Sequence, residues 1–182
     1  MITDALVAFV GIGGNLSLVG AAGSTFASPL TYDFLGQGVG QPPGNFIGNR
    51  TLAGTDEGVG GKRPELNITI GTAVVAVGAC VLKAALQGAP DTGLAGGYLP
   101  GTWVDIDSQD NIAAANLTAG AVIFRSPWIP QMPANLQARY LRLLFTLSGG
   151  TSFTAGTIGS ALVTMVRDDQ ANKFAAKNFT VA

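Results

Sequence analysis

Three aspartates close together in the sequence are the best candidates for a ligand-binding site. Asp105, Asp107 and Asp110 lie within six residues, and carboxylate oxygens are the ligands that Ca²⁺ prefers. The calcium-loop pattern is not met, however, because Asp110 stands where that loop requires glycine and no glutamate closes it. We therefore expect a solvated turn after a short strand, and ion binding by these residues is left open.

The other patterns that could support catalysis are incomplete. The chain contains no histidine, which removes Ser-His-Asp and Cys-His catalysis and most zinc sites. Residues 11–16 begin like a dinucleotide-binding loop, but Leu16 replaces the third glycine and no βαβ pattern follows. Residues 61–63 lack the earlier glycine and the Ser/Thr of a phosphate loop, and Ser152 lacks the second glycine of a nucleophile elbow. We expect no catalytic residue, no cofactor and no bound metal.

The composition favours a protein that buries much of its surface against other subunits. Charged residues make up 12% of the chain, against about 25% in an average protein. A neutral, glycine-rich β protein would show the same composition, and the two interpretations are compatible. The net charge is −1, with no Lys or Arg before Arg50, so nucleic acid is not an expected partner.

No membrane association is expected either. The longest apolar run, residues 73–86, is interrupted by Gly78 and Lys83 and is shorter than the roughly 18 residues that a spanning helix needs. The single cysteine, Cys80, lies inside this run and is expected to be a buried, inert thiol. A chain without an intrachain disulfide is consistent with assembly in a reducing cytoplasm.

The two ends of the chain differ in amino-acid composition from its middle. Residues 1–49 carry only Asp4 and Asp33 as charges, together with many Gly, Ala and Ser. This segment predicts an N-terminal arm that orders against a neighbouring subunit, with a long loop packed on its own domain as the alternative. Residues 50–65 predict an exposed, charged loop, and residues 168–182 predict a second, C-terminal contact arm.

Residues 50–167 are predicted to form one all-β domain, a jelly-roll-like β-sandwich. Apolar and polar residues alternate over 66–70, 140–147 and 157–166, which is the period of half-buried strands. Further strands are expected at 79–87, 103–107 and 121–125, with a helix as the alternative at 79–87 and 140–147. Residues 148–150 (SGG) between the last two strands predict a hairpin. The expected core includes Trp103, Tyr140, Leu143, Phe145 and Leu162.

The second half of the chain resembles the cement, or decoration, proteins of tailed-bacteriophage capsids. The resemblance is carried by residues 103–106 (WVDI), 119–123 (AGAVI), 139–143 (RYLRL), 149–150 (GG), 153–156 (FTAG) and 161–163 (ALV). Residues 23–25 (GST) and 32–35 (YDFL) add a weaker likeness. It covers most of residues 66–166, whereas residues 42–64 are longer than the family pattern.

The resemblance implies a jelly-roll-like protein on the outer surface of the virion. Such proteins bind as homotrimers between subunits of the major capsid protein, and the family has no catalytic motif to carry over. If both ends of the chain are contact arms, their aromatic side chains are the expected partner contacts. These are Phe9, Phe26, Tyr32 and Phe34 in the first arm, and Phe174 and Phe179 in the second.

Two other functions remain as alternatives from the sequence. A carbohydrate-binding or host-adhesion sandwich would need exposed aromatic residues on one platform, for which Tyr98, Trp103 and Trp128 are the obvious set. Another head or tail subunit would share the same composition and would differ from a cement protein in its number of copies per virion.

Overall fold

The structure is a computed structural model that describes residues 2–33, 65–93, 99–127, 136 and 138–165. The expected C-terminal arm lies outside these residues, as does the expected loop at 50–65 except for Glu65. Of the expected partner contacts, Phe34, Phe174 and Phe179 also lie outside the described residues.

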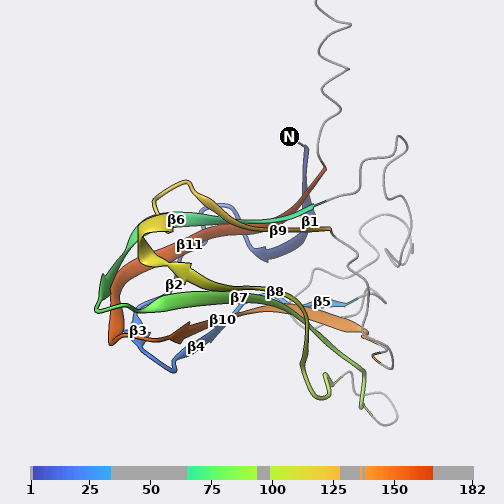
Figure 1. Ribbon diagram of the computed structural model, residues 1–182. Helices are drawn as coiled ribbons and strands as arrows, with labels where there is room; N and C mark the ends of the chain where they lie inside the picture. The colour runs from blue at the N-terminus through green and yellow to red at the C-terminus, as the bar shows by residue number, and fades with distance from the viewer. Residues whose placement is uncertain (1, 34–64, 94–98, 128–135, 137, 166–182) are drawn as a thin grey trace, which may run out of the picture.

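The chain folds into two antiparallel sheets stacked face to face, which Figure 1 shows as an upper and a lower layer. The six-stranded sheet, called sheet A, comprises β1 (Ile2–Val10), β11 (Ser152–Met165), β6 (Glu65–Val77) and β9 (Val122–Pro127), with β2 (Leu16–Ser17) and β3 (Gly20–Ala21) paired to β11. The five-stranded sheet B comprises β4 (Thr25–Ala27), β10 (Tyr140–Ser148), β7 (Val81–Ala89) and β8 (Val104–Ala113), with β5 (Tyr32–Asp33) paired to β10.

The path of the chain is that of a jelly roll. Leaving aside the two-residue strands, the chain changes sheet at every connection except β7 to β8, and the sheet orders are β1-β11-β6-β9 and β4-β10-β7-β8. Two Greek keys of this kind make a double-sheet sandwich. The only helical element in the described part of the chain is the 3₁₀ turn η1 (Ala114–Asn116). The prediction of an all-β sandwich is confirmed.

The alternating patterns place their apolar residues in the core between the sheets, because successive side chains of a strand point to opposite faces. Leu66, Ile68 and Ile70 of β6 are buried, and in β10 the side chains of Leu141, Leu143, Phe145 and Leu147 are fully buried. Tyr140 and Leu162 are buried as predicted, whereas Trp103 is only half-buried. The helical alternatives at 79–87 and 140–147 are wrong, since both segments are strands.

The predicted hairpin at residues 148–150 is wrong. β10 pairs with β7 in sheet B, and β11 pairs with β6 in sheet A. The SGG turn therefore crosses from one sheet to the other instead of joining neighbouring strands. Gly149 and Gly150 have φ values of 62° and 50°, which glycine adopts without strain. The turn lets both strands direct apolar side chains into the same core.

The described part of the expected N-terminal arm belongs to the sandwich. Residues 2–33 contribute β1 to β5, with strands in both sheets. The side chains of Phe9 and Tyr32 are 0% and 4% exposed, and Phe26 is half-buried against the core. Phe9 and Tyr32 are thus core residues of the chain, not surface residues open to a partner. The low charge of a segment is the same whether it packs on a neighbouring subunit or on its own domain, so composition does not distinguish the two.

Within the described residues, no helix is long and apolar enough to cross a membrane.

Candidate interaction surface

An uncharged, partly apolar surface lies on the outer side of sheet A. Ser152 of β11 is paired with Ala21 of β3 on one side and with Val77 of β6 on the other, and residues opposed in this way share a face of the sheet. The alternation of β6 and β11 adds Val75 and Thr154, and the exposed Val19 comes directly before β3. We call this surface the neutral face, and its residues are Val19, Ala21, Val75, Val77, Ser152 and Thr154.

The valines of the neutral face are unusually exposed for their type. Val19, Val75 and Val77 are 50%, 53% and 48% exposed. Val75 and Thr154 are joined by a hydrogen bond, in which the Thr154 hydroxyl donates to the carbonyl oxygen of Val75 at 3.3 Å. Gathering exposed apolar side chains on one face is typical of a protein–protein interaction surface.

The sequence around the neutral face carries no charge. Residues 5–32, 66–82 and 143–166 contain no Asp, Glu, Lys or Arg. These three segments supply β2, β3, β6 after Glu65, and β11. Sheet pairing therefore brings together three uncharged stretches that are far apart in the sequence.

Sheet B carries a contrasting outer surface, on which charged side chains neutralise one another. Asp105 accepts hydrogen bonds from Nζ of Lys83 and from Nε2 of Gln87, both at 2.7 Å. Nε of Arg142 donates to Oε1 of Gln87 at 2.9 Å, and its guanidinium lies 4.3 Å from the centroid of the Trp103 ring. We call these five residues the polar strip, which links β8, β7 and β10 across the sheet.

The pKa values of the polar strip follow from these contacts. Burial alone would raise the pKa of Asp105, but the hydrogen bonds from Lys83 and Gln87 and the lysine charge outweigh it, so its pKa is lowered. The hydrogen bond to Asp105 raises the pKa of Lys83. Burial lowers the pKa of Arg142, whose cation also lies against Trp103. Lys83 and Asp105 therefore both keep their charges at neutral pH.

The three neighbouring aspartates do not converge on one point. They lie in strand β8, not in the turn that the sequence predicts. Asp105 and Asp110 both face Lys83, whose ammonium lies 2.7 Å from the first and 3.7 Å from the second. Asp107 instead accepts a 2.6 Å hydrogen bond from the hydroxyl of Ser126 on β9. Acidic residues on an edge strand such as β8 oppose its pairing with another chain.

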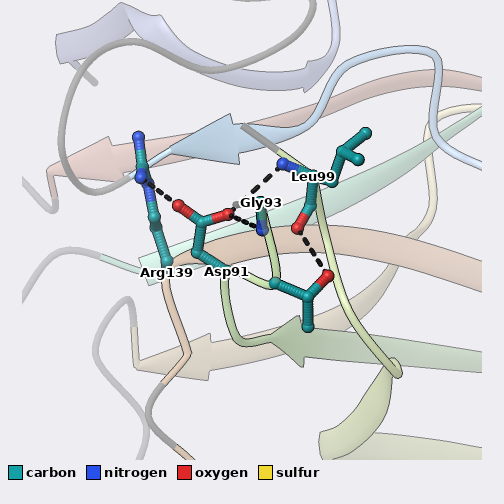
Figure 2. A network of polar contacts seen from close by, with 5 residues as sticks. Asp91, Gly93, Leu99 and Arg139 are labelled. Carbon is teal, nitrogen blue, oxygen red and sulfur yellow. Dashed lines mark hydrogen bonds and ion pairs between the residues drawn. The ribbon is translucent and has the colours of Figure 1, made fainter. Parts of the chain in front are cut away.

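A second polar cluster, shown in Figure 2, fastens the β7–β8 connection to the start of β10. Oδ1 of Asp91 accepts hydrogen bonds from the backbone N–H groups of Gly93 at 2.9 Å and Leu99 at 3.3 Å, and Oδ2 pairs with the guanidinium of Arg139. The backbone N–H of Arg139 also donates to the carbonyl of Ala89 at 2.9 Å. We call this cluster the Asp91 clamp.

The Asp91 clamp makes stability depend on pH in a predictable direction. The N–H of Gly93, then that of Leu99 and the charge of Arg139, lower the pKa of Asp91 below its usual 3.8. A carboxyl whose pKa is lower in the folded state stabilises the fold above its unfolded pKa, and this contribution is lost as pH falls through the folded pKa.

We therefore expect Asp91→Asn to be less stable than the wild type at neutral pH, with the difference narrowing as the pH falls below the usual 3.8 of the carboxyl. Urea unfolding of both chains at neutral pH and through the acidic range measures it, because the other carboxyls are common to both. A stability difference that persists unchanged in acid would contradict the assigned role of the Asp91 carboxylate.

The structure also shows which residues sequence reasoning missed. Asp91 and Arg139 are 48 residues apart and belong to no recognisable sequence motif, so only the fold brings them together. Trp103, one of the three aromatic residues of the carbohydrate-binding alternative, has one ring face against Arg142. Its companions Tyr98 and Trp128 lie outside the described residues. Across the described chain, no group of three or more His, Cys, Asp or Glu side chains is placed to hold a metal ion.

No protein-family model matches the chain, and no curated protein matches its sequence.

Proposed function

We propose that this chain is a structural protein of a tailed-bacteriophage virion that decorates the capsid and stabilises it without catalysis. In this proposal it acts as a homotrimer on the outer surface of the head, between subunits of the major capsid protein. The observation that carries the proposal is a jelly-roll sandwich built from a chain with only 12% charged residues, about half the usual share. Nucleic acid and membrane are not partners in this proposal.

The residues that carry the family resemblance support the proposal through the framework of the fold. Residues 103–106 lead into and begin β8, 119–123 lead into β9, and 139–143 begin β10. Residues 153–156 and 161–163 lie in β11. The resemblance therefore covers strands of both sheets and residues of the core, and it concerns the scaffold more than the surface.

The physical demands of a capsid-stabilising protein agree with the composition of the chain. Such a protein needs many weak contacts that act together, because the shell offers the same site many times and linked contacts reinforce one another. Apolar contacts keep their strength when the salt concentration changes, whereas contacts between exposed charges are screened. A chain with 12% charged residues suits contacts of the first kind.

Heads that lack this chain provide the functional test. Adding the purified protein to them is expected to raise the temperature at which the heads break open and release DNA. Heads that already carry the protein are the control, and addition should change nothing there. Equal release temperatures with and without the protein in deficient heads would count against a stabilising role.

A further inference from the structure

The neutral face raises the question of which partner covers it. Its exposed side chains come from three stretches of sequence without charge, brought together by β3, β11 and β6. The polar strip on sheet B shows that the chain does place charged side chains on the outer side of a sheet, where they pair with one another. Exposed Arg125 of β9, which is paired with Asn67 of β6, carries a charge elsewhere on sheet A, so the absence of charge is a local property of the neutral face.

We infer that the neutral face is the surface through which copies of this chain associate with one another. In a symmetric oligomer, residues close to the rotation axis meet their own equivalents in the other copies. A charge at such a place faces a like charge, which weakens the association. A different protein could instead supply an opposite charge for each exposed charge, so contact with it would not require an uncharged surface.

The shape and chemistry of the neutral face agree with contact between copies. Val75 and Val77 stand two residues apart on β6, while Ala21 of β3 lies on the other side of β11 with Val19 two residues before it in the chain. Between these two apolar rows lie Ser152 and Thr154, whose hydroxyl groups can donate and accept hydrogen bonds. Uncharged groups that both donate and accept can pair with identical groups, which a surface of lysines or of aspartates cannot do.

This inference rests on the proposed function only for the number of copies, which should be three. The face itself is tested on the purified chain in the absence of heads. Sedimentation equilibrium of the wild type at tens of micromolar should give the mass of an oligomer, a trimer under the proposed function.

The deciding variant is Val75→Lys combined with Val77→Lys. Because it brings several like charges together at the axis, we expect the dissociation constant of the oligomer to rise by about a hundredfold or more. The matched control is Ser108→Lys with Gln109→Lys, which adds the same charge to exposed positions of β8 in sheet B and should leave the oligomer intact. Circular dichroism checks that both variants are folded.

If the double-lysine variant does not fold, Val75→Thr with Val77→Thr decides, because threonine keeps the branched shape and should weaken association in the same direction. A wild type that stays monomeric at all concentrations would overturn the inference. An oligomer that the variants of the neutral face leave unchanged would also overturn it.

Binding to deficient heads, measured separately, distinguishes this inference from the proposed function. A trimer that dissociates in the lysine variant but never binds heads would sustain the face and refute the capsid role. A monomeric chain that binds heads and stabilises them would do the opposite, and the neutral face would then be covered by coat protein.

Discussion

Replacing Phe9 with alanine is expected to lower the free energy of unfolding of the isolated chain by about 3–5 kcal/mol. The side chain of Phe9 is fully buried in the core, and it sits in β1, which closes one edge of sheet A against β11. Truncation removes apolar contacts and leaves a cavity that surrounding side chains fill only in part. Equilibrium denaturation in urea, followed by circular dichroism, measures the loss.

The matched control for Phe9 is Ile12→Ala, which lies in the same N-terminal stretch but whose side chain is 80% exposed. It should change stability by no more than about 0.5 kcal/mol. If Phe9→Ala were as stable as the wild type and only weakened binding to heads, Phe9 would be a residue of a contact arm and not of the core.

Deleting residues 1–30 should abolish folding of the isolated chain, because the deletion removes β1 to β4 from the sandwich.

The second large effect is expected at the turn where the chain crosses between the sheets. A Cβ atom added to Gly150 would lie 2.2 Å from the backbone nitrogen of Cys80 and 2.6 Å from the carbonyl carbon of Ala79. Backbone atoms cannot move away as the end of a side chain can. The φ of Gly150 is also +50°, which is unfavourable for alanine. Gly150→Ala should therefore cost about 3 kcal/mol or more.

Gly120→Ala separates the two causes of this effect. Gly120 has a φ of +81°, but a Cβ atom there would meet nothing within 4 Å. Only the backbone penalty remains, so we expect a loss of about 1–2 kcal/mol. Thermal and urea unfolding of both variants gives the comparison. Equal losses at Gly120 and Gly150 would mean that the close contact with Cys80 and Ala79 has no energetic weight.

The strands that the sequence predicts well are those with one buried face. Over residues 66–70 of β6 and 141–147 of β10 every second residue is apolar, so the alternation predicts both the strand and its inward side chains, as the burial of Ile68 and Phe145 confirms. For the edge strand β8 the sequence predicts only residues 103–107, since β8 contains Asp105, Asp107 and Asp110 and has little apolar alternation. A period of two is readable only where one face avoids water.

Strand pairing and long-range polar contacts could not be predicted from the sequence. A glycine-containing turn after β10 is compatible with a hairpin and with a crossing between sheets, and the choice depends on where β6 and β7 lie. The neutral face could not be predicted for the same reason, because Ala21, Val77 and Ser152 become neighbours only through strand pairing. The placement of Phe9 in the core depended on whether its segment packs on its own domain, which low charge alone does not determine.

Co-sedimentation of the purified chain with phage heads that lack it tests the proposed capsid role most directly. The number of copies bound per head is measured as the protein concentration rises. The proposal predicts saturable binding, at a plateau close to equimolar with the major capsid protein. Absence of binding, or saturation at only a few copies per head, would contradict it and would favour a tail, connector or adhesion subunit.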